Sequence, residues 1–329
     1  MENRKENIMG TRPINKLLPS MAFPIMLSML VQALYNVVDS IFVSMVSENA
    51  LTSVSLIFPV QNLMIAVSVG TAVGINALLS RRLGEKNFEA ANRVASNGIL
   101  VTLISFVVFA IFGALGSDMF LAAFTQNPEI AQAGADYMRI VTIFSLGAFV
   151  EITMERILQV TGKTVYQMIS QMTGAVVNII LDPIMIFGLL GCPKMGVAGA
   201  AATVIGQWCA MFVALILNHW KNHEVRISLA NMRPHGHTIR GIYQVGLPSI
   251  IMQSISSVMV FGMNKILISF TETAVSVFGV YFKLQSFVFM PVFGITNALI
   301  PIVGYNYGAR QRKRILDTIR LGIIMAPAI

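Results

Sequence analysis

The sequence predicts an all-α polytopic membrane protein made of two parallel six-helix repeats, the second of them incomplete. Three observations predict this class. Of the 329 residues, 55% are hydrophobic and 12% are charged, and the mean hydropathy is +0.72, which is typical of a membrane protein. The apolar residues form runs long enough to cross a bilayer, which takes about 20 residues. The pattern of the first six runs then starts again near residue 241.

Eight complete membrane spans are expected, and a ninth begins near Ile315 and stops at Ile329 in mid-helix. Short polar gaps separate the spans, which suits helices that alternate in direction. In chain order the expected spans are 17–46, 51–80, 95–116, 137–160, 164–190, 196–218, 241–270 and 275–304.

Basic residues predict the orientation of these spans. Nineteen of the 23 Lys and Arg residues lie in 1–16, 81–93, 156–163, 219–240 and 305–320, which eight spans place on one side. Positive residues mark the cytoplasmic face, so the N-terminus is expected inside, in a multi-pass protein of the cell membrane. The net charge of +8 therefore reflects topology, and nucleic-acid binding is not expected.

The segment 219–240 is expected to be a cytoplasmic loop between an N-terminal six-helix lobe, 1–218, and a partial C-terminal lobe, 241–329. Because six is an even number, the two lobes have the same orientation, related by an axis along the membrane normal. Two complete repeats would need a longer chain, so a carboxy-terminal truncation is expected. A shift of 224 residues aligns Pro24 with Pro248, Glu48 with Glu272, Ala50 with Ala274, Phe58 with Phe282, Gln61 with Gln285, Gly70 with Gly294 and Gly84 with Gly308.

The first span contains an ionisable residue, Asp39, which is unusual in a membrane helix. Ser28, Gln32, Tyr35 and Asp39 recur at spacings of three and four, so they share one face of a helix. An ionisable group inside a span costs about 2.5–3.5 kcal/mol on insertion scales and normally faces a cavity or a partner. The face that bears Asp39 is therefore expected to be in contact with water.

The fifth span has a second polar face. Gln167, Gln171, Asn178 and Asp182 are spaced four, seven and four apart. Pro183 follows Asp182 and removes a backbone hydrogen bond, which tends to kink a helix.

Asp39 and Asp182 are expected at matching depth, in one shared cavity of the first six helices. Such a pair could hold a proton at near-neutral pH. Alternatively, Asp39, Asp182, Asn178 and Thr203 in the sixth span offer hard oxygen ligands that suit Na⁺. A third interpretation is that one acid merely hydrogen-bonds a helix end.

Other charged residues carry less information. Glu151, Glu155 and Arg156 of the fourth span are expected to pair with one another or to reach the interface, a structural role. The roles of Lys265 and Lys283 stay open. The four histidines lie in or beside the loop 219–240 without an acidic or cysteine framework, so no metal site is expected there.

Three stretches resemble one known family. Pro24 through Val43, with Tyr35 and Asp39, resembles the first helix of the multidrug and toxic compound extrusion (MATE) family. The run NIILDPIMIFG, which begins at Asn178, and the run GVAGAAAT, which ends at Thr203, look like the signature of its fifth and sixth helices. PIVGYNYGA, from Pro301, resembles the end of its eighth helix. The likeness covers essentially the whole chain.

The resemblance implies twelve helices in two lobes that work by alternating access. It implies that Asp39, Asn178, Asp182 and Thr203 match the ion site of the amino-terminal lobe, with Tyr35 beside it. One branch of the family also uses a glutamate in its seventh helix, where this chain has GMNKI at 262–266, without an acid. That difference favours coupling through the first lobe.

We therefore expect a secondary active antiporter that exports organic, cationic and amphipathic compounds in exchange for H⁺ or Na⁺. Its partners are expected to be small organic substrates and the lipid bilayer, with no cofactor and no enzymatic activity, in a monomeric protein. Ser28, Gln32, Tyr35 and Gln171 are expected to line the substrate cavity. Pro24 and Pro183 are expected to act as hinges, with the first span bending near Pro24 when the ion binds.

Two other functions were weighed against this one. A flippase for a lipid-linked saccharide, from the same wider superfamily, would have a more basic central cavity, and Lys265 and Lys283 keep it open. An intramembrane aspartyl protease also needs two membrane aspartates. It is disfavoured because Val38 and Leu181 precede the two acids, where that class has Gly or Tyr.

Overall fold

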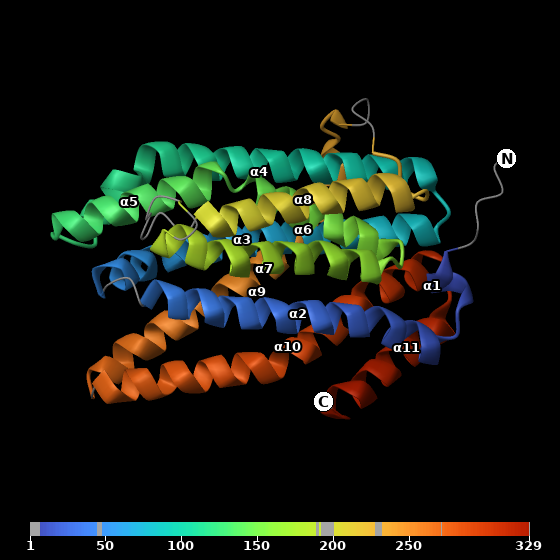
Figure 1. Cartoon of the computed structure of the whole chain (residues 1–329). Helices are drawn as coiled ribbons and strands as arrows, with labels where there is room; N and C mark the ends of the chain where they lie inside the picture. Colours follow the sequence, from blue (N-terminus) through green and yellow to red (C-terminus); the bar gives the residue numbers. More distant parts are fainter. Residues whose placement is uncertain are drawn as a thin grey trace.

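The computed structural model describes residues 7–44, 48–188, 191, 201–227, 232–270 and 272–328. The chain forms long helices, of which α2 to α8 lie roughly parallel and α9 to α11 are inclined to them (Figure 1). In chain order they are α1 (Ile8–Thr11), α2 (Ile14–Ser44), α3 (Glu48–Gly84), α4 (Phe88–Ala122), α5 (Pro128–Ile143), α6 (Leu146–Val160), α7 (Thr164–Phe187), α8 (Ala201–Lys221), α9 (Gly236–Ile268), α10 (Glu272–Gly308) and α11 (Arg312–Met325), with a 3₁₀ turn at Ala326–Ala328.

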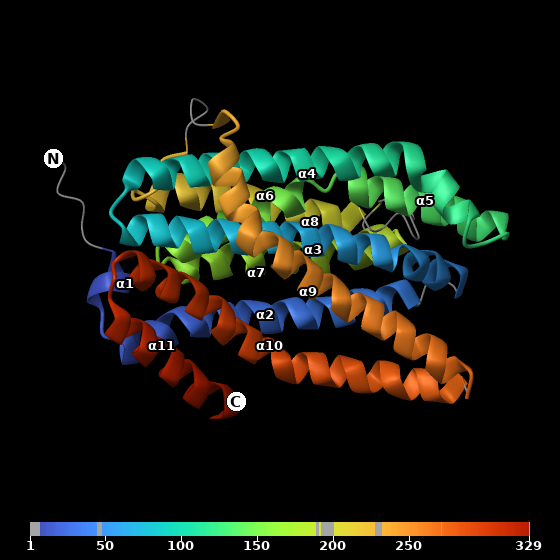
Figure 2. The ribbon, with the colours of Figure 1, turned by 180° about the vertical axis from the view of Figure 1, so that it is seen from behind.

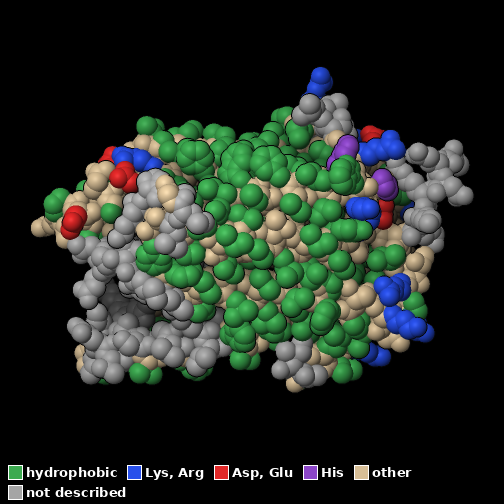
Figure 3. All heavy atoms as spheres, viewed as in Figure 1, with side chains coloured by type: hydrophobic (Ala, Val, Ile, Leu, Met, Phe, Trp, Pro, Cys, Tyr) green, Lys and Arg blue, Asp and Glu red, His purple; other side chains and the backbone are tan. Residues whose placement is uncertain are grey.

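The surface of this bundle is suited to lipid. Leu115 and Met119 are 81% and 78% exposed, and hydrophobic side chains cover the length of the face in Figure 3. An apolar surface of this extent is stable against hydrocarbon and not against water. The predicted all-α membrane class is confirmed. Within the described residues, six helical segments are long and apolar enough to span a membrane: Ile14–Tyr35, Leu56–Gly84, Phe88–Ala122, Thr164–Phe187, Ala201–Lys221 and Phe287–Gly308.

Basic side chains gather at one end of the bundle, the right-hand end in Figure 3. We call it the basic end. It carries α1 and the connections at 85–87, 161–163 and 309–311, together with residues 222–227 and 232–235. The other end, which carries the connection between α9 and α10, is called the opposite end.

The predicted span 137–160 is wrong as a single helix. The structure has two helices there, α5 and α6, which are separated at Phe144 and Ser145. Two side chains satisfy carbonyls at the break: the Ser145 hydroxyl donates to Thr142 O (2.7 Å), and the indole N–H of Trp208 donates to Phe144 O (3.0 Å). Hydropathy did not reveal the break because the residues on both sides of it are apolar.

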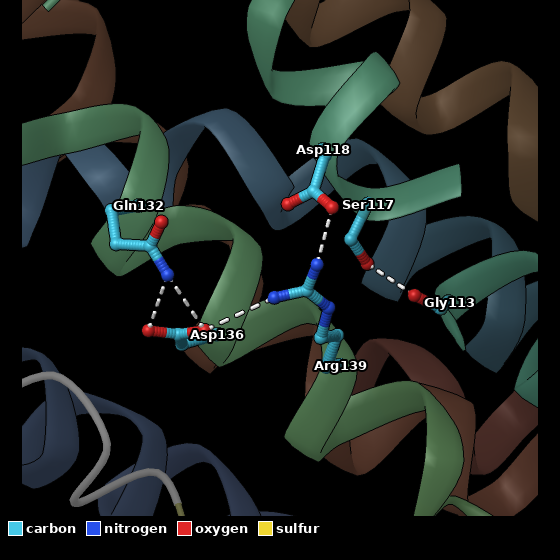
Figure 4. A network of polar contacts seen from close by, with 6 residues as sticks. All are labelled: Gly113, Ser117, Asp118, Gln132, Asp136 and Arg139. Carbon is cyan, nitrogen blue, oxygen red and sulfur yellow. Dashed lines mark hydrogen bonds and ion pairs between the residues drawn. The ribbon is translucent and has the colours of Figure 1, made fainter. Parts of the chain in front are cut away.

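At the opposite end a small polar network joins α4 to α5 (Figure 4). The Arg139 guanidinium on α5 contacts Asp118 on α4 and also Asp136, at 3.2 Å. The Gln132 amide donates to Asp136 at 3.1 Å. These groups are partly exposed, so the network orients the two helices and adds little stability.

The helix bounds repeat with the shift of 224 residues that relates the two halves of the sequence. α10 spans the same positions as α3 under that shift, and α11 begins where α4 does. The turns that follow α3 and α10 also match, because Lys86 and Arg310 both have a left-handed backbone, with φ of 56° and 57°. This correspondence supports the prediction of two equivalent lobes.

The lobes pack together near the basic end. A cluster of buried apolar side chains there draws on both lobes, including Leu17, Met21 and Leu83 of the first and Ile302 and Tyr305 of the second. Figures 1 and 2 agree that α9 and α10 run away from α4 and α5 toward the opposite end. The structure is therefore a conformation that is closed between the lobes at the basic end.

Candidate functional site

α7 carries the polar face that the sequence predicted on the fifth span. It ends at Gly188, whose left-handed backbone (φ 73°) lets its N–H donate to Ile184 O. Glycine adopts that conformation without strain, so it suits a helix end. Near that end, Asn178 and Asp182 are 3% and 1% exposed. Both polar groups are thus enclosed inside an apolar bundle.

Asn178 joins two of the predicted ion ligands. Its side-chain N–H₂ donates to Asp182 Oδ1 at 3.1 Å and to Thr203 Oγ1 of α8 at 3.0 Å. Its own Oδ1 is buried and receives no hydrogen bond from any described residue. A buried acceptor without a donor is unfavourable by about 1–3 kcal/mol, so this oxygen is suited to a water molecule or a cation.

Small residues bring α8 close enough for this contact. A Cβ at Gly206 of α8 would lie 2.8 Å from Gly174 O and 3.2 Å from the Cβ of Asn178. A Cβ at Gly174 would lie 2.9 Å from that of Ala210. Close approach of membrane helices depends on such small side chains. Here it places Thr203 within reach of Asn178.

The cavity residues predicted on α2 fall into two groups. Gln171 of α7 donates to Gln32 of α2 at 3.1 Å, so these two side chains are brought together. Tyr35 is half-buried farther along α2. Ser28 is fully buried, and its hydroxyl donates to Ile25 O of its own helix at 2.9 Å. Ser28 is therefore satisfied within α2.

The remaining positions from the sequence analysis are Asp39, Lys265, Lys283, Pro24 and Pro183. The backbone of Asp39 lies in α2, but its side chain is outside the described residues, as are those of Lys265 and Lys283. The pairing of Asp39 with Asp182 therefore stays a prediction. Pro24 and Pro183 lie inside α2 and α7, and both helices continue through them. Their role as hinges also stays a prediction.

A second polar network, which the sequence reasoning missed, joins the two lobes. Gln159 of α6 donates to Asn297 O of α10 at 2.7 Å and accepts from Asn76 of α3 at 3.0 Å. Arg156 donates to Gln159 Oε1 at 2.9 Å and to Asn297 Oδ1 at 3.0 Å. Asn76 and Gln159 are 1% and 0% exposed. The sequence feature that could have revealed this network is an amide side chain, Asn76, Gln159 or Asn297, in each of three apolar spans.

The expected pairing of Glu151, Glu155 and Arg156 is not what the structure has. In the described part of the chain no ion pair joins Arg156 to either acid, because its guanidinium is engaged by Gln159 and Asn297. Glu155 is 6% exposed, and its Oε1 receives no hydrogen bond from a described residue. Amide acceptors on α6 itself (Gln159) and on α10 (Asn297) thus take the hydrogen bonds of Arg156.

The donors around Asp182 do not yet define a metal site. Among the described residues no group of three or more His, Cys, Asp and Glu side chains could hold a metal ion. Asp182, Asn178 and Thr203 supply oxygen atoms of the kind that hard cations prefer. The same acid with water can equally carry a proton, so both coupling ions stay open at this site.

Comparison with known proteins identifies close similarities. A family model described as MatE matches residues 24–184 and 248–329. The multidrug export protein MepA of Staphylococcus haemolyticus is 24% identical over 318 residues, covering 96% of this chain and 69% of the relative. The FAD transporter of Shewanella oneidensis is 23% identical over 315 residues, covering 94% and 69%. A structure described as the outward-facing conformation of a multidrug resistance MATE family transporter matches with a TM-score of 0.90 and 27% identity, covering 99% and 72%.

Proposed function

The chain belongs to the MatE family of transporters, and on that premise we propose that it is a secondary active antiporter that exports organic cations in exchange for H⁺ or Na⁺. Its relatives are transporters and not enzymes. One observation carries the proposal: Asp182 is almost fully enclosed, within an apolar bundle, by a hydrogen-bonded set of polar groups. Such a group inside a membrane span is characteristically used to bind or move an ion.

In the proposed mechanism Asp182 binds the coupling ion while the lobes are closed at the basic end. Asn178 holds one oxygen of Asp182 in place and keeps its own Oδ1 free for the ion or its water. Asp39 lies on the neighbouring helix α2 and supplies the second carboxylate. Ion binding then repacks α2 near Pro24 and empties a substrate cavity that includes Tyr35, Gln32 and Gln171. The work of transport comes from the ion gradient.

The proposed orientation puts the basic end in the cytoplasm of a cell membrane, with the N-terminus inside, because positive residues stay on that side. The state with the basic end closed then exposes the binding site to the outside. That arrangement supports the proposal because an exporter must release its substrate outside and collect the ion there. A monomer suffices for this mechanism.

The substrate class rests on the relatives. MepA is described as a multidrug export protein, whereas the Shewanella relative is described as an FAD transporter. The polar side chains that α2 and α7 contribute, Gln32, Gln171, Asn178 and Asp182, are amides and a carboxylate, which suit an organic cation better than an anion. A flippase for a lipid-linked saccharide is not favoured, because the matched relatives are efflux and FAD transporters.

The test uses protein reconstituted in lipid vesicles, with ethidium as the organic cation and FAD as the anionic alternative. A pH gradient and a Na⁺ gradient are imposed separately. We expect ethidium movement with one of the two gradients, and its loss in Asp182→Asn. Asp136→Asn, an exposed acid at the opposite end, is the control. Undiminished ion-driven transport by Asp182→Asn would contradict the proposal, and transport of FAD alone would replace the substrate class.

A further inference from the structure

Glu155 is a membrane carboxyl group without a function in the proposal above. It lies in the last two turns of α6 and is 6% exposed, and no described residue donates to its Oε1. The adjacent cation, Arg156, interacts with it electrostatically but directs its guanidinium hydrogen bonds to Gln159 and Asn297. A buried acid whose counterion is engaged elsewhere is unfavourable, so its presence needs a reason.

The helical hairpin of α6 and α7 fixes the depth of Glu155. The two helices meet at 161–163 and run in opposite directions from that turn. Glu155 is seven residues before Gly162, and Gln167 and Gln171 are five and nine residues after it. With a rise of about 1.5 Å per residue, Glu155 lies at a depth between those two glutamines.

The neighbours of α6 fix the direction of Glu155. The carbonyl of Met154 accepts from Asn218 of α8 at 3.0 Å, and Gln159 bonds to α10. On a helical wheel Glu155 projects between these two directions. Of the other helices that contact α6, α4 lies on the far side of the wheel, where Thr102 bonds to Thr153, so α7 is left for the sector of Glu155. Glu155 therefore faces α7, the helix that carries Gln171.

A row of buried acceptors connects this position with Asp182. The side-chain oxygens of Gln167, Gln171 and Asn178 are buried, and no described residue donates to them. These three residues share one face of α7 with Asp182. Buried polar atoms are normally satisfied by protein or by ordered water, so a row of them marks a hydrated path.

The network between the lobes closes this path toward the basic end. Gln159 lies one turn beyond Glu155 and bonds to both Asn76 and Asn297. Arg156 adds a bond to Asn297 Oδ1. Three helices, α3, α6 and α10, are therefore joined by amides just below the carboxyl group. Water on the Glu155 side is separated from the basic end in this conformation.

We propose that Glu155 is a second proton carrier of the transport cycle, connected to Asp182 by a hydrated path along α7 and released by separation of the lobes at Asn297. This inference rests on the proposed function. A proton suits Glu155 better than Na⁺, because the neighbouring oxygen of Gln159 is already bonded to Asn76 and Arg156. The charged groups on its own helix are Glu151 and Arg156, and Asp182 lies along the path on α7.

The release step follows from the partners of Arg156. When α10 moves away from α6, Arg156 loses Asn297 and is free to turn toward Glu155. The Glu155 O–H bond then breaks, its proton passes to water at the opened basic end, and the carboxylate pairs with the guanidinium. No other reactant is needed. Lobe separation and proton release are thereby the same event.

The first test counts protons. Organic cation is added to purified protein in weakly buffered detergent solution, and released protons are measured with a pH-sensitive dye. We expect Glu155→Gln to release about one proton fewer than the unmodified protein, and Glu155→Asp to restore it. Asp182→Asn distinguishes the inference about Glu155 from the proposed transport function. Normal release and transport by Glu155→Gln, with loss in Asp182→Asn, overturns the inference and leaves the proposed function standing.

The second test does not depend on transport. In a background with Cys192 and Cys209 replaced by serine, single cysteines are introduced at Gln167 and Gln171 and exposed to 2-aminoethyl methanethiosulfonate, which reacts with thiolates in water. Matched controls are Ile169→Cys and Val176→Cys, which are 41% and 50% exposed on the lipid side of α7. We expect at least about tenfold faster reaction on the polar face. Equal or slower reaction there would contradict the hydrated path.

Discussion

Gly84 of the first lobe and Gly308 of the second contact each other's helix reciprocally. A Cβ at Gly84 would meet Tyr305 O and lie 3.0 Å from Ala309 N, and a Cβ at Gly308 would meet Arg81 O and lie 3.0 Å from Glu85 N. Each pair becomes the other under the shift of 224 residues. Gly70 and Gly294 behave in the same way, against Ile250 and Met26. At Gly84 and Gly308 the two helices thus meet backbone against backbone.

The first prediction concerns this contact. Gly84→Ala is expected to force the lobes apart at the basic end, because a methyl group there would overlap the Tyr305 carbonyl. We expect a shift toward the conformation open at the basic end, seen as longer spin-label distances between α3 and α10. Gly262→Ala is the control, since a Cβ there meets nothing within 4 Å. Unchanged distances in Gly84→Ala would show that the contact does not hold the lobes closed.

The second prediction concerns the network at Gln159. Gln159→Met leaves the Asn76 amide without its acceptor and Asn297 O without its donor, at the contact of α3, α6 and α10. Each orphaned group costs about 1–3 kcal/mol, so the melting temperature in detergent is expected to fall by several degrees. Thr173→Val is the matched control, because that hydroxyl bonds only to its own helix. Equal melting temperatures for both variants would exclude a stabilising role for the network.

The third prediction concerns Thr203. Thr203→Val keeps the shape but removes an acceptor of the Asn178 amide, which then holds Asp182 less firmly. The expected loss of about 1–3 kcal/mol corresponds to roughly 5- to 150-fold weaker binding of the coupling ion. It is measured as the ion concentration that half-saturates ethidium transport. Thr203→Ser retains a hydroxyl and should behave like the unmodified protein; a similar loss there would point to packing instead.

The fourth prediction concerns the pH dependence of the turn at Glu85. Burial raises the pKa of Glu85, but hydrogen bonds and charges from Arg82 and Arg81 more than offset this, so its pKa is lowered. A lowered pKa means that Glu85 stabilises the fold above the ordinary glutamate range and loses this contribution as pH falls through its folded pKa. Glu85→Gln should therefore reduce thermal stability slightly at pH 7 and not at a pH below the lowered pKa of Glu85, where the carboxyl group is protonated. A deficit that persists at the acidic end would be inconsistent with this assignment.

The fifth prediction is a small effect. Asp118→Asn removes one of the two acids at Arg139, but Asp136 remains and the site is partly exposed. Exposed ion pairs contribute about 0–1 kcal/mol, so the melting temperature should change by no more than about 2 °C. A drop comparable to that of Gln159→Met would mean that the network in Figure 4 stabilises the bundle far more than its exposure suggests.

Much of the fold could be predicted because the bilayer imposes simple rules. Apolar runs of sufficient length located the long helices, although helices such as α3 and α10 extend past them into polar residues. The break between α5 and α6 could not be predicted, because it depends on Trp208, a residue far along the chain, reaching Phe144 O.

The candidate site likewise has features that one helix determines alone and features that depend on packing between helices. The spacing on α7 placed Gln171, Asn178 and Asp182 on one face, which one helix determines by itself. The contact of Asn178 with Thr203 required two glycines to bring α7 and α8 together. Glu155 and Arg156 were expected to pair because they are neighbours in sequence. Arg156 instead bonds to Asn297, which lies 141 residues away in the sequence.

The sequence by itself determined that this protein crosses a membrane many times, repeats itself, and carries acids on helix faces where hydrocarbon would otherwise lie. Those properties follow from composition and periodicity, which each segment expresses alone. Only the tertiary structure decided which end of the bundle is closed, which groups surround Asp182, and why Arg156 bonds to Gln159 and Asn297 and not to Glu155. The reason is that hydrogen bonds between helices depend on depth and rotation together, and both are set by packing across the whole bundle.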